Sequence, residues 1–265
     1  MKAMLKYPCG KWRIADWIID YFPTHRVYCE PFFGSGAVFF KKKPAYTETI
    51  NDIDGNIVNL FEVCRKHPKE LAAAINLTPF SREEFCNCYD VNVKDPIERA
   101  RRTVVRYHQS FGTSNSFKNS WKNTQTAGGP RCATMWSYLP ETVIEVCERL
   151  KEVQIENIDA LELIKRYDSQ ETLIYCDPPY LPELRKKNIY AQEMSLEKHI
   201  QLLELLKQSK SKIILSGYDS ELYNDMLSGW FTAEKITTAQ MGLHRTEKLW
   251  MNFIPDNTQL RIDGI

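Results

Sequence analysis

The sequence contains no run of apolar residues long enough to cross a membrane. A membrane-spanning helix needs about 18 or more consecutive apolar residues, and no stretch of the 265 residues approaches that length. The first residues, MKAMLKYPCGKW, also lack the apolar core of a secretory signal peptide. These two absences exclude a helical membrane protein and lead us to expect a cytoplasmic one.

A strong net charge and closely spaced cysteine motifs are also lacking. The formal net charge is +1, so overall charge gives no sign of a nucleic-acid partner. Eight cysteines are present, but Cys86 and Cys88 are the only close pair and no C-x-x-C motif occurs. Without export we expect reduced thiols instead of disulfides, and we expect no metal site.

Charge is distributed less evenly than the small net value suggests. Residues 94–131 contain eight basic and two acidic residues, an excess of six positive charges on a nearly neutral chain. Such a segment is typical of a protein that holds a polyanion at one place. A solvated helix face would give the same composition, so charge alone leaves both interpretations open.

Strands and helices alternate in two parts of the chain. The patterns predict strands at residues 25–33, 47–54, 152–158, 172–176 and 211–217, most of them followed by amphipathic helices. Two further apolar segments, WFTAEKI and KLWMNFI, predict a terminal hairpin. The expected fold class is therefore α/β, with a mostly parallel Rossmann-like sheet covered on both faces and ending in an antiparallel hairpin.

A helical and loop insert interrupts this alternation. Residues 69–110 look helical throughout, and Ser81 with Glu84 forms a capping-box signal. Residues 111–131 are polar and rich in glycine, asparagine, serine and threonine, and loops of that length are usually functional or disordered. We expect one sheet domain made of residues 1–63 and 141–265, with residues 64–140 as an inserted domain.

Polar residues follow several of the predicted strands. Ligands of open parallel sheets bind at the carboxyl ends of the strands, where this chain places Gly34 and Gly36, then Asp52, and later Asp159. Glycines between a strand and a helix let a ligand approach the backbone closely. Asp52 suits ribose hydroxyls, although Asp54 competes for that role and looks like a helix N-cap. Asp159 suits an adenine amine or a cap, or both.

The tetrapeptide Asp177-Pro178-Pro179-Tyr180 follows the buried strand TLIYC. Prolines donate no hydrogen bond but leave their carbonyl groups as acceptors. A carboxylate and a proline carbonyl can together hold the two hydrogens of a planar amine and offset the charge that develops when its nitrogen attacks. The tyrosine ring offers a face for stacking a base, which would have to be flipped out of a duplex. A rigid turn with a capping aspartate is the alternative.

The ordered set of motifs resembles the Dam-type, phage-like, site-specific DNA adenine N-6 methyltransferases. The set comprises Y-P-x-G-K at residues 7–11, P-F-x-G-x-G at 31–36, N-D-I at 51–53, D-P-P-Y at 177–180 and E-K-L-W-M-N at 247–252. It extends from residue 7 to about residue 254 and weakens in the insert. Other amino-methyltransferases share D-P-P-Y alone, but the whole order is more specific. Cys9 is a departure, since many relatives have a second glycine there.

The resemblance implies S-adenosylmethionine as methyl donor, duplex DNA as partner and location in a bacterial cell or phage-infected host. The donor pocket implied by the family consists of Tyr7, Lys11, Phe32, Gly34, Gly36, Asp52, Asp159 and Asp177. Lys11 would meet the methionine carboxylate, Asp52 the ribose and Asp159 the adenine amine. The catalytic residues implied for the target adenine are Asp177, Pro178, Pro179 and Tyr180.

Reading of DNA is assigned to the insert by elimination, with arginine, lysine and asparagine as the usual partners of base edges and phosphates. The candidates are Arg102, Arg106, Ser114, Asn115, Lys118, Trp121, Lys122 and Arg131 in the insert, and Arg185 and Lys187 in the loop after DPPY. Each of them has an ordinary surface role as its alternative. We expect a monomer or a weak dimer. The competing functions are methylation of RNA adenine or of a protein amide, and a DNA-binding module without catalysis.

Overall fold

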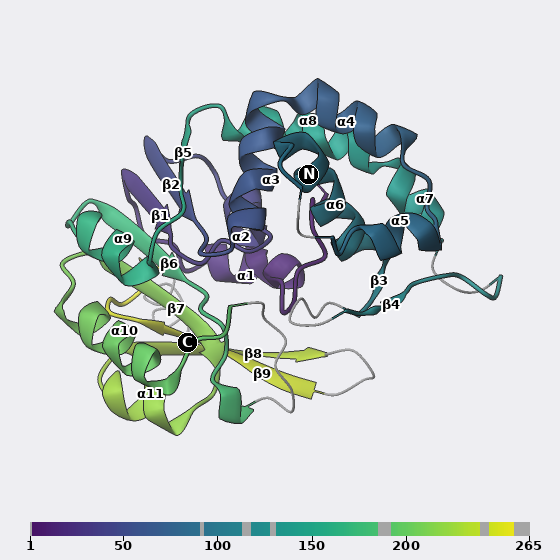
Figure 1. Cartoon of the computed structure of the whole chain (residues 1–265). Coiled ribbons are helices and arrows are strands. Elements are labelled where there is room, and N and C mark those ends of the chain that lie inside the picture. Colours follow the sequence, from purple (N-terminus) through teal and green to yellow (C-terminus); the bar gives the residue numbers. More distant parts are fainter. Residues whose placement is uncertain are drawn as a thin grey trace.

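One mixed sheet organises the structure, a computed structural model that describes residues 2–90, 93–112, 118–127, 131–184, 192–238 and 244–256. Within these residues seven strands have the order β5-β2-β1-β6-β7-β9-β8 (Figure 1). Their bounds are β1 Val27–Glu30, β2 Thr47–Asn51, β5 Val153–Glu156, β6 Thr172–Cys176, β7 Lys212–Tyr218, β8 Phe231–Thr238 and β9 His244–Met251. The first five in spatial order are parallel. β9 runs antiparallel to β7, and β8 to β9, which confirms the expected fold class and terminal hairpin.

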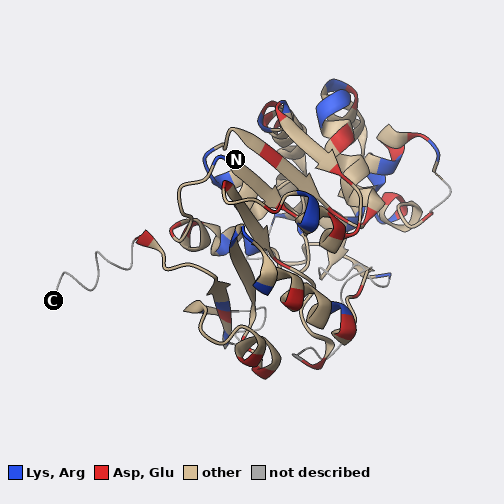
Figure 2. Ribbon diagram, turned by 90° about the vertical axis from the view of Figure 1, so that its left-hand side faces the viewer, with Lys and Arg blue, Asp and Glu red and all other residues tan. Residues whose placement is uncertain are grey.

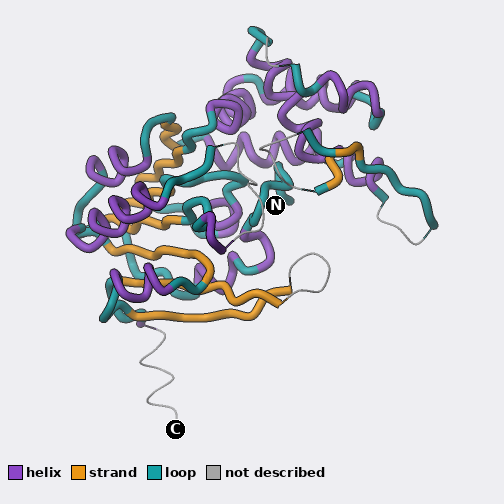
Figure 3. The backbone as a smooth tube through the Cα atoms, turned by 60° about the horizontal axis from the view of Figure 1, so that its bottom comes forward, coloured by secondary structure: helices purple, strands orange, loops and turns teal. Residues whose placement is uncertain are grey.

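The two faces of the sheet carry two separate apolar clusters, because side chains alternate along each strand. Tyr28, Leu173 and Tyr175 point to one face, where they join α1 (Ala15–Ile19), α2 (Ala37–Lys41) and α3 (Gly55–Lys66). Cys29 and Ile174 point to the other face, with α9 (Ala160–Arg166), α10 (Leu196–Gln208) and α11 (Glu221–Met226). Helices therefore cover both faces, as predicted (Figure 3).

The helical segment is less continuous than expected. Residues 69–110 were predicted to be helical throughout, but the structure divides them among α4 (Pro68–Leu77), α5 (Arg82–Asn87) and α6 (Pro96–Gln109). Ser81 caps α5 by accepting a hydrogen bond from the Glu84 N–H, and Asp95 caps α6 before Pro96. The Ser81 cap was recognised in the sequence without a helix being ended before it, and the cap and proline signal at Asp95 and Pro96 was overlooked.

The remaining elements of this region are a short antiparallel pair and two more helices. Strands β3 (Ser110–Phe111) and β4 (Ser120–Trp121) form the pair, and α7 (Cys132–Ser137) and α8 (Leu139–Leu150) follow. Helix α6 packs on α3, and α8 packs on both α3 and α4. The expected domain limits at residues 64 and 140 fall inside α3 and α8, and the division into domains stays a prediction.

The N-terminal segment runs beneath the helical region and reaches the sheet. Met4 and Leu5 are fully buried, and the Met4 carbonyl oxygen lies 2.9 Å from His108 Nε2 on α6. A short 3-10 helix at Lys11–Arg13 follows. This path carries Tyr7 and Lys11 to the carboxyl ends of the strands. None of the helices in the described part of the chain has the length and apolar character that crossing a membrane requires.

Gly36 is a site where the fold itself demands glycine. Its φ of +65° lies in the left-handed region at the start of α2, and an added Cβ would come within 2.7 Å of the Phe40 ring and closer still to Phe33. We expect Gly36→Ala to lower the free energy of unfolding by about 2–4 kcal/mol, from backbone strain plus overpacking. Urea unfolding measures this loss.

Gly229 offers the matched control, because its φ is +88° but an added Cβ would meet nothing within 4 Å. Gly229→Ala should lose only the strain contribution, about 1 kcal/mol. Equal losses in the two variants would contradict the packing part of the argument.

Candidate active site

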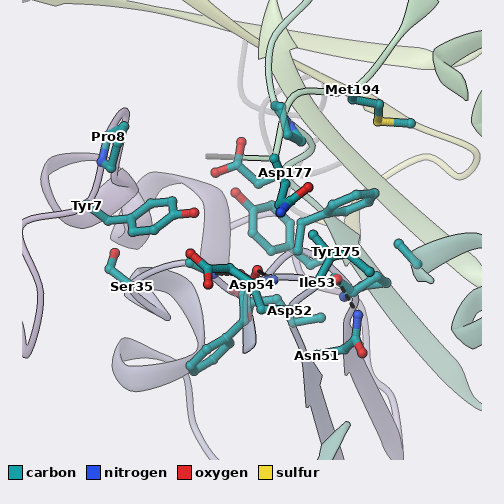
Figure 4. A pocket seen from close by; sticks show the side chains of 18 of the residues that line it. Tyr7, Pro8, Ser35, Asn51, Asp52, Ile53, Asp54, Tyr175, Asp177 and Met194 are labelled. Carbon is teal, nitrogen blue, oxygen red and sulfur yellow. Dashed lines mark hydrogen bonds between the residues drawn. The ribbon is translucent and has the colours of Figure 1, made fainter. Parts of the chain in front are cut away.

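A cleft of about 1040 Å³, counting the open solvent at its mouth, lies at the carboxyl ends of the parallel strands. Its walls come from the N-terminal segment, the turn after β1, the ends of β2, β5 and β6, and residues 192–194 and Lys198. In Figure 4 Tyr7 and Met194 lie on opposite sides of it, with Asp52, Tyr175 and Asp177 between them. All residues predicted to hold the donor except Gly36 line this cleft, and their roles stay predictions.

The turn after β1 brings the backbone to the floor of the cleft. Gly34 has a φ of +50°, and a Cβ there would lie 3.0 Å from the Tyr7 ring, so glycine allows the ring to pack on the turn. Gly36 instead begins α2 behind the cleft. Cys9 also has a positive φ, 53°. A non-glycine residue is uncommon in that conformation, so the backbone at this position would suit a glycine better.

Asp52 holds this turn to the end of β2. Its carboxylate accepts hydrogen bonds from the N–H of Gly34 at 2.7 Å and of Asp54 at 2.9 Å. Burial raises the pKa of Asp52 to about 6, even though both hydrogen bonds act in the opposite direction. Asp54 caps α3 by accepting from the Asn56 N–H, as the sequence suggested. Asp52 is thus the buried carboxylate of the two.

Asn51 was not predicted as a site residue, yet it joins three strand ends. Its side-chain amide donates to the carbonyl oxygens of Pro31 and Ile158, and its oxygen accepts from the Ile158 N–H at 2.9 Å. Asn51 opens the N-D-I motif at residues 51–53, which is the sequence signal that could have identified it. The residue fixes the loops after β1 and β5 relative to β2.

Asp159 takes the capping role that the sequence left open, and its contact with an adenine amine stays a prediction. It caps α9 by accepting from the Leu161 N–H, and its other oxygen lies 3.2 Å from Lys198 Nζ. Burial alone would raise the pKa of Asp159, but the hydrogen bonds from Lys198 and Leu161 outweigh it and lower the pKa. Its side chain is 42% exposed, so it remains accessible from the cleft.

Asp177 turns one carboxylate oxygen toward the protein interior. Oδ1 accepts a hydrogen bond from Ser216 Oγ and an ion pair from Lys11 Nζ, both at 2.9 Å. No hydrogen bond from any described residue reaches Oδ2, and the side chain is 20% exposed. One oxygen is therefore fixed while the other is available to a ligand in the cleft.

Lys11 lies at the centre of a buried polar cluster. Its ammonium, 3% exposed, contacts Asp177, the Tyr180 hydroxyl and, at 3.5 Å, Glu247 of β9. Burial alone would lower the pKa of Lys11, but the charges of Asp177 and Glu247 raise it well above its ordinary value. Two carboxylates of the chain thus surround the ammonium in this structure, and the expected contact of Lys11 with the donor's carboxylate stays a prediction.

The Tyr180 ring, predicted to be a stacking face, is covered in this structure, and its role stays a prediction. Tyr180 is 3% exposed and is absent from the residues that line the cleft. The Tyr218 ring lies 4.1 Å away between centroids, and Lys11 Nζ lies 4.6 Å from the Tyr180 centroid. Both contacts are at the ring, so in this structure a base cannot stack there without a rearrangement.

Folding offsets part of the charge excess of the insert, because two of its arginines pair with acids. Arg101 pairs with Glu84 and Glu98, and Arg102 pairs with Glu98 and Asp90. Glu84 and Asp90 lie outside the counted segment 94–131, which is why composition overstated the charge. Basic and acidic segments interleave along these helices (Figure 2). The Arg102 guanidinium, predicted to contact DNA, is therefore paired with acids of the protein itself.

The other predicted DNA contacts have mixed placements. Arg106 and Lys118 lie over the Tyr89 ring, at 5.2 and 5.4 Å from its centroid. Trp121 is half-buried and donates to Gln109 at 3.3 Å, whereas Arg131 is exposed. Ser114, Asn115, Arg185 and Lys187 lie outside the described residues.

Lys122 has a basic neighbour that the sequence did not suggest. Burial lowers the pKa of Lys6, and the nearby charge of Lys122 lowers it further. Arg82 lies over the Trp121 ring at 4.9 Å. Lys6 and Arg82 thus extend the basic surface around β4, although they lie far from Lys122 in sequence.

Glu30, at the end of β1, is a buried acid that lines the cleft. It is 2% exposed and accepts a hydrogen bond from the Tyr28 hydroxyl at 2.6 Å. Burial raises its pKa from 4.5 to about 8; the Tyr28 hydrogen bond opposes this shift and the charge of Asp177 adds to it. An acid before Pro31 at a strand end was visible in the sequence but was not selected.

The raised pKa of Glu30 makes stability depend on pH. The folded state holds this proton more tightly than the unfolded state, so the stability it contributes is complete below pH 4.5 and is lost as pH rises to about 8. We expect Glu30→Gln to remove this dependence. Between pH 5 and 8 the free energy of unfolding of the variant should therefore rise relative to that of the parent by a few kcal/mol, since one pKa unit corresponds to ~1.4 kcal/mol. Urea unfolding at both pH values measures it.

Glu171→Gln is the control, because that side chain is 64% exposed. It should leave the pH dependence of the parent unchanged. A parallel pH dependence in Glu30→Gln and the parent would show that Glu30 does not carry it.

Comparison with known proteins agrees with this arrangement. Residues 7–241 match the family described as D12 class N6 adenine-specific DNA methyltransferase. A DNA adenine methylase of Haemophilus influenzae is 24% identical over 249 residues, 86% of this chain and 83% of its own length. The type II methyltransferase M1.LlaDCHI of Lactococcus lactis subsp. cremoris is 26% identical, with 85% of each chain covered.

A phage protein is similar as well. The DNA N-6-adenine-methyltransferase of Escherichia phage P1 is 21% identical over 84% of this chain and 31% of its own length. The family match extends from the Y-P-x-G-K motif through DPPY to the terminal hairpin, so it includes every wall of the cleft. The chain therefore belongs to the D12 class of N6 adenine-specific DNA methyltransferases.

Proposed function

We propose that this methyltransferase takes its methyl group from S-adenosylmethionine and delivers it to an adenine flipped out of double-stranded DNA. The observation that carries the proposal is the position of Asp177 in the wall of the cleft, with Oδ1 fixed by Lys11 and Ser216 and Oδ2 open to a ligand. The same cleft is bounded at its other end by the glycine turn and Asp52. Donor and target would therefore meet at Asp177.

The residues of the cleft suit the proposed donor. The cleft lies at the carboxyl ends of parallel strands, where open α/β sheets bind their ligands. The glycine turn leaves the backbone bare next to Tyr7, and Asp52 and Asp159 provide acceptors for hydroxyl and amine groups. Glu30 adds a buried carboxyl near Asp177. Tyr7, Phe32, Asp52 and Asp159 would hold the donor.

The chemistry of the site is positioning and charge stabilisation. When bound, the donor supplies a methyl carbon that leaves sulfur, with the bonding electrons remaining there, and takes the lone pair of the adenine amine nitrogen. Asp177 Oδ2 and the Pro178 carbonyl would accept the two amine hydrogens and aim the nitrogen. The fixed negative charge of Asp177 would stabilise the positive charge on that nitrogen. The amine proton leaves after transfer, so Asp177 need not act as a base beforehand.

The DNA would lie across the insert and the mouth of the cleft. The β3–β4 pair and the β8–β9 hairpin extend on the same side of the molecule (Figures 1 and 3). We propose the basic residues near this side as phosphate and base contacts, namely Lys6, Arg82, Arg106, Lys118, Lys122 and Arg131. The family description names DNA, so methylation of RNA or of a protein amide receives no support.

The function is tested by incubating the protein with plasmid DNA and labelled S-adenosylmethionine. Digestion and nucleoside analysis should show label in N6-methyl-2′-deoxyadenosine and none in deoxycytidine derivatives. Label retained only on RNA or protein would overturn the proposal.

Asp177→Ala should abolish methyl transfer but leave donor binding nearly unchanged. The substitution removes the acceptor proposed for the amine, while Asp52 and the glycine turn keep their geometry. Transfer of labelled methyl to DNA measures the first effect, and calorimetry with S-adenosylmethionine measures the second. Asp16→Ala is the control, since that carboxylate is 77% exposed and pairs with Lys41. Parental turnover in Asp177→Ala would refute the assignment.

Asp52 and Asp54 are distinguished by donor affinity. Asp52→Asn removes a buried charge proposed to meet the donor's hydroxyl groups and should raise the Kd for S-adenosylmethionine about tenfold, as expected for a charged hydrogen bond. Asp54→Asn keeps a good N-cap residue and should leave the Kd within about twofold. Calorimetry gives both values. The reverse order would transfer the role to Asp54.

A further inference from the structure

Glu247 is the buried acid of the Lys11 cluster that the family motifs leave without a role. It lies on β9 directly opposite Tyr218 of β7 and Lys235 of β8. Its side chain is 10% exposed and accepts hydrogen bonds from the Tyr180 hydroxyl at 3.0 and 3.1 Å. It does not line the cleft. Any effect on the reaction must therefore pass through Lys11 or Tyr180.

The charges of the cluster do not cancel. Lys11 carries one positive charge, and Asp177 and Glu247 each carry one negative charge when ionised, which leaves one excess negative charge beside the open Oδ2 of Asp177. Lys11 Nζ lies 2.9 Å from Asp177 and 3.5 Å from Glu247, so its charge is shared. Without Glu247, the lysine would neutralise Asp177 alone. Charges this well buried interact strongly, because little water screens them.

We propose that Glu247 is an electrostatic positioning residue that draws the charge of Lys11 away from Asp177, so that Asp177 keeps the negative charge needed by the methylated amine. This inference rests on the proposed function, since it concerns the same amine. It extends that function by giving a residue of the terminal hairpin a part in positioning charge for the reaction. Glu247 also holds the Tyr180 hydroxyl, and through it the last residue of DPPY.

Other charged groups around Glu247 are engaged elsewhere. Arg245 donates to the Tyr218 hydroxyl at 2.7 Å, and Lys235 lies over the Trp17 ring at 5.6 Å. Glu30 faces Asp177, and burial raises its pKa to about 8. Cys9 and the hydroxyls of Tyr180 and Tyr218 complete the surroundings. Among the residues that the structure describes, Lys11 is thus the cation that pairs with Glu247.

The test compares Glu247→Gln with Glu234→Gln. Glu234 lies on the same hairpin, is 53% exposed and pairs with Lys248, so its loss removes the same charge away from the cluster. With saturating donor and DNA, Glu247→Gln should lower the single-turnover rate of methyl transfer about tenfold, with little change in KM or in the Kd for donor. Glu234→Gln should react at the parental rate.

A pH profile separates charge from packing. Burial raises the pKa of Glu247, so the parental rate should fall as pH drops through that raised value and Glu247 takes up a proton. Glu247→Gln should lack this part of the fall, and Glu247→Asp should keep it and recover part of the rate. The inference is overturned by a parental rate in Glu247→Gln, by equal behaviour of the Gln and Asp variants, or by an equal loss in Glu234→Gln.

A measurement without donor or DNA keeps this inference distinct from the proposed function. The ammonium nitrogen resonance of Lys11 should shift in Glu247→Gln and stay in place in Glu234→Gln. If the parent methylates no DNA, the proposed function fails. If the Lys11 resonance is the same in the parent and Glu247→Gln, the shared ion pair does not exist and the inference fails by itself.

Discussion

The ion pair between Lys11 and Asp177 is the contact on which the site depends. It joins the N-terminal segment to the end of β6, and Glu247 extends it to the terminal hairpin. A buried ammonium is tolerated only with partners that offset its loss of water. The three segments are distant in sequence, so this one charge requires the first turn, the central strand and the last strand of the sheet to fold together.

Much of the fold could be predicted from local pattern. The short apolar runs TLIYC and KIILSG predicted the central strands, which are buried along nearly their whole length. Asp54 and Ser195 cap their helices as their positions suggested. The breaks after Leu77 and Asn87 were missed because helical propensity continues across them, while the caps at Ser81 and Asp95 decide where new helices begin. Local signals thus predicted elements better than their ends.

The site was predictable only as far as chain order goes. Strand ends of a parallel sheet meet at one edge, so Asp52, Asp159 and Asp177 could be brought together from topology alone. The pairing of Lys11 with Glu247 could not be predicted in this way, because it depends on the register of β9 against β7. The covering of Tyr180 by Tyr218, and of Arg101 by Glu84, likewise depends on tertiary packing. Charge counts over one segment therefore misjudged the basic surface.

The insert begins and ends on helices that already touch. Helix α3 leads into it and α8 leads out, and these two helices pack against each other beside the sheet. Whatever lies between them can change in length or sequence without moving the ends of β2 or β5. The part of the chain proposed to read DNA could therefore be exchanged while the strands that carry the cleft residues stay in place.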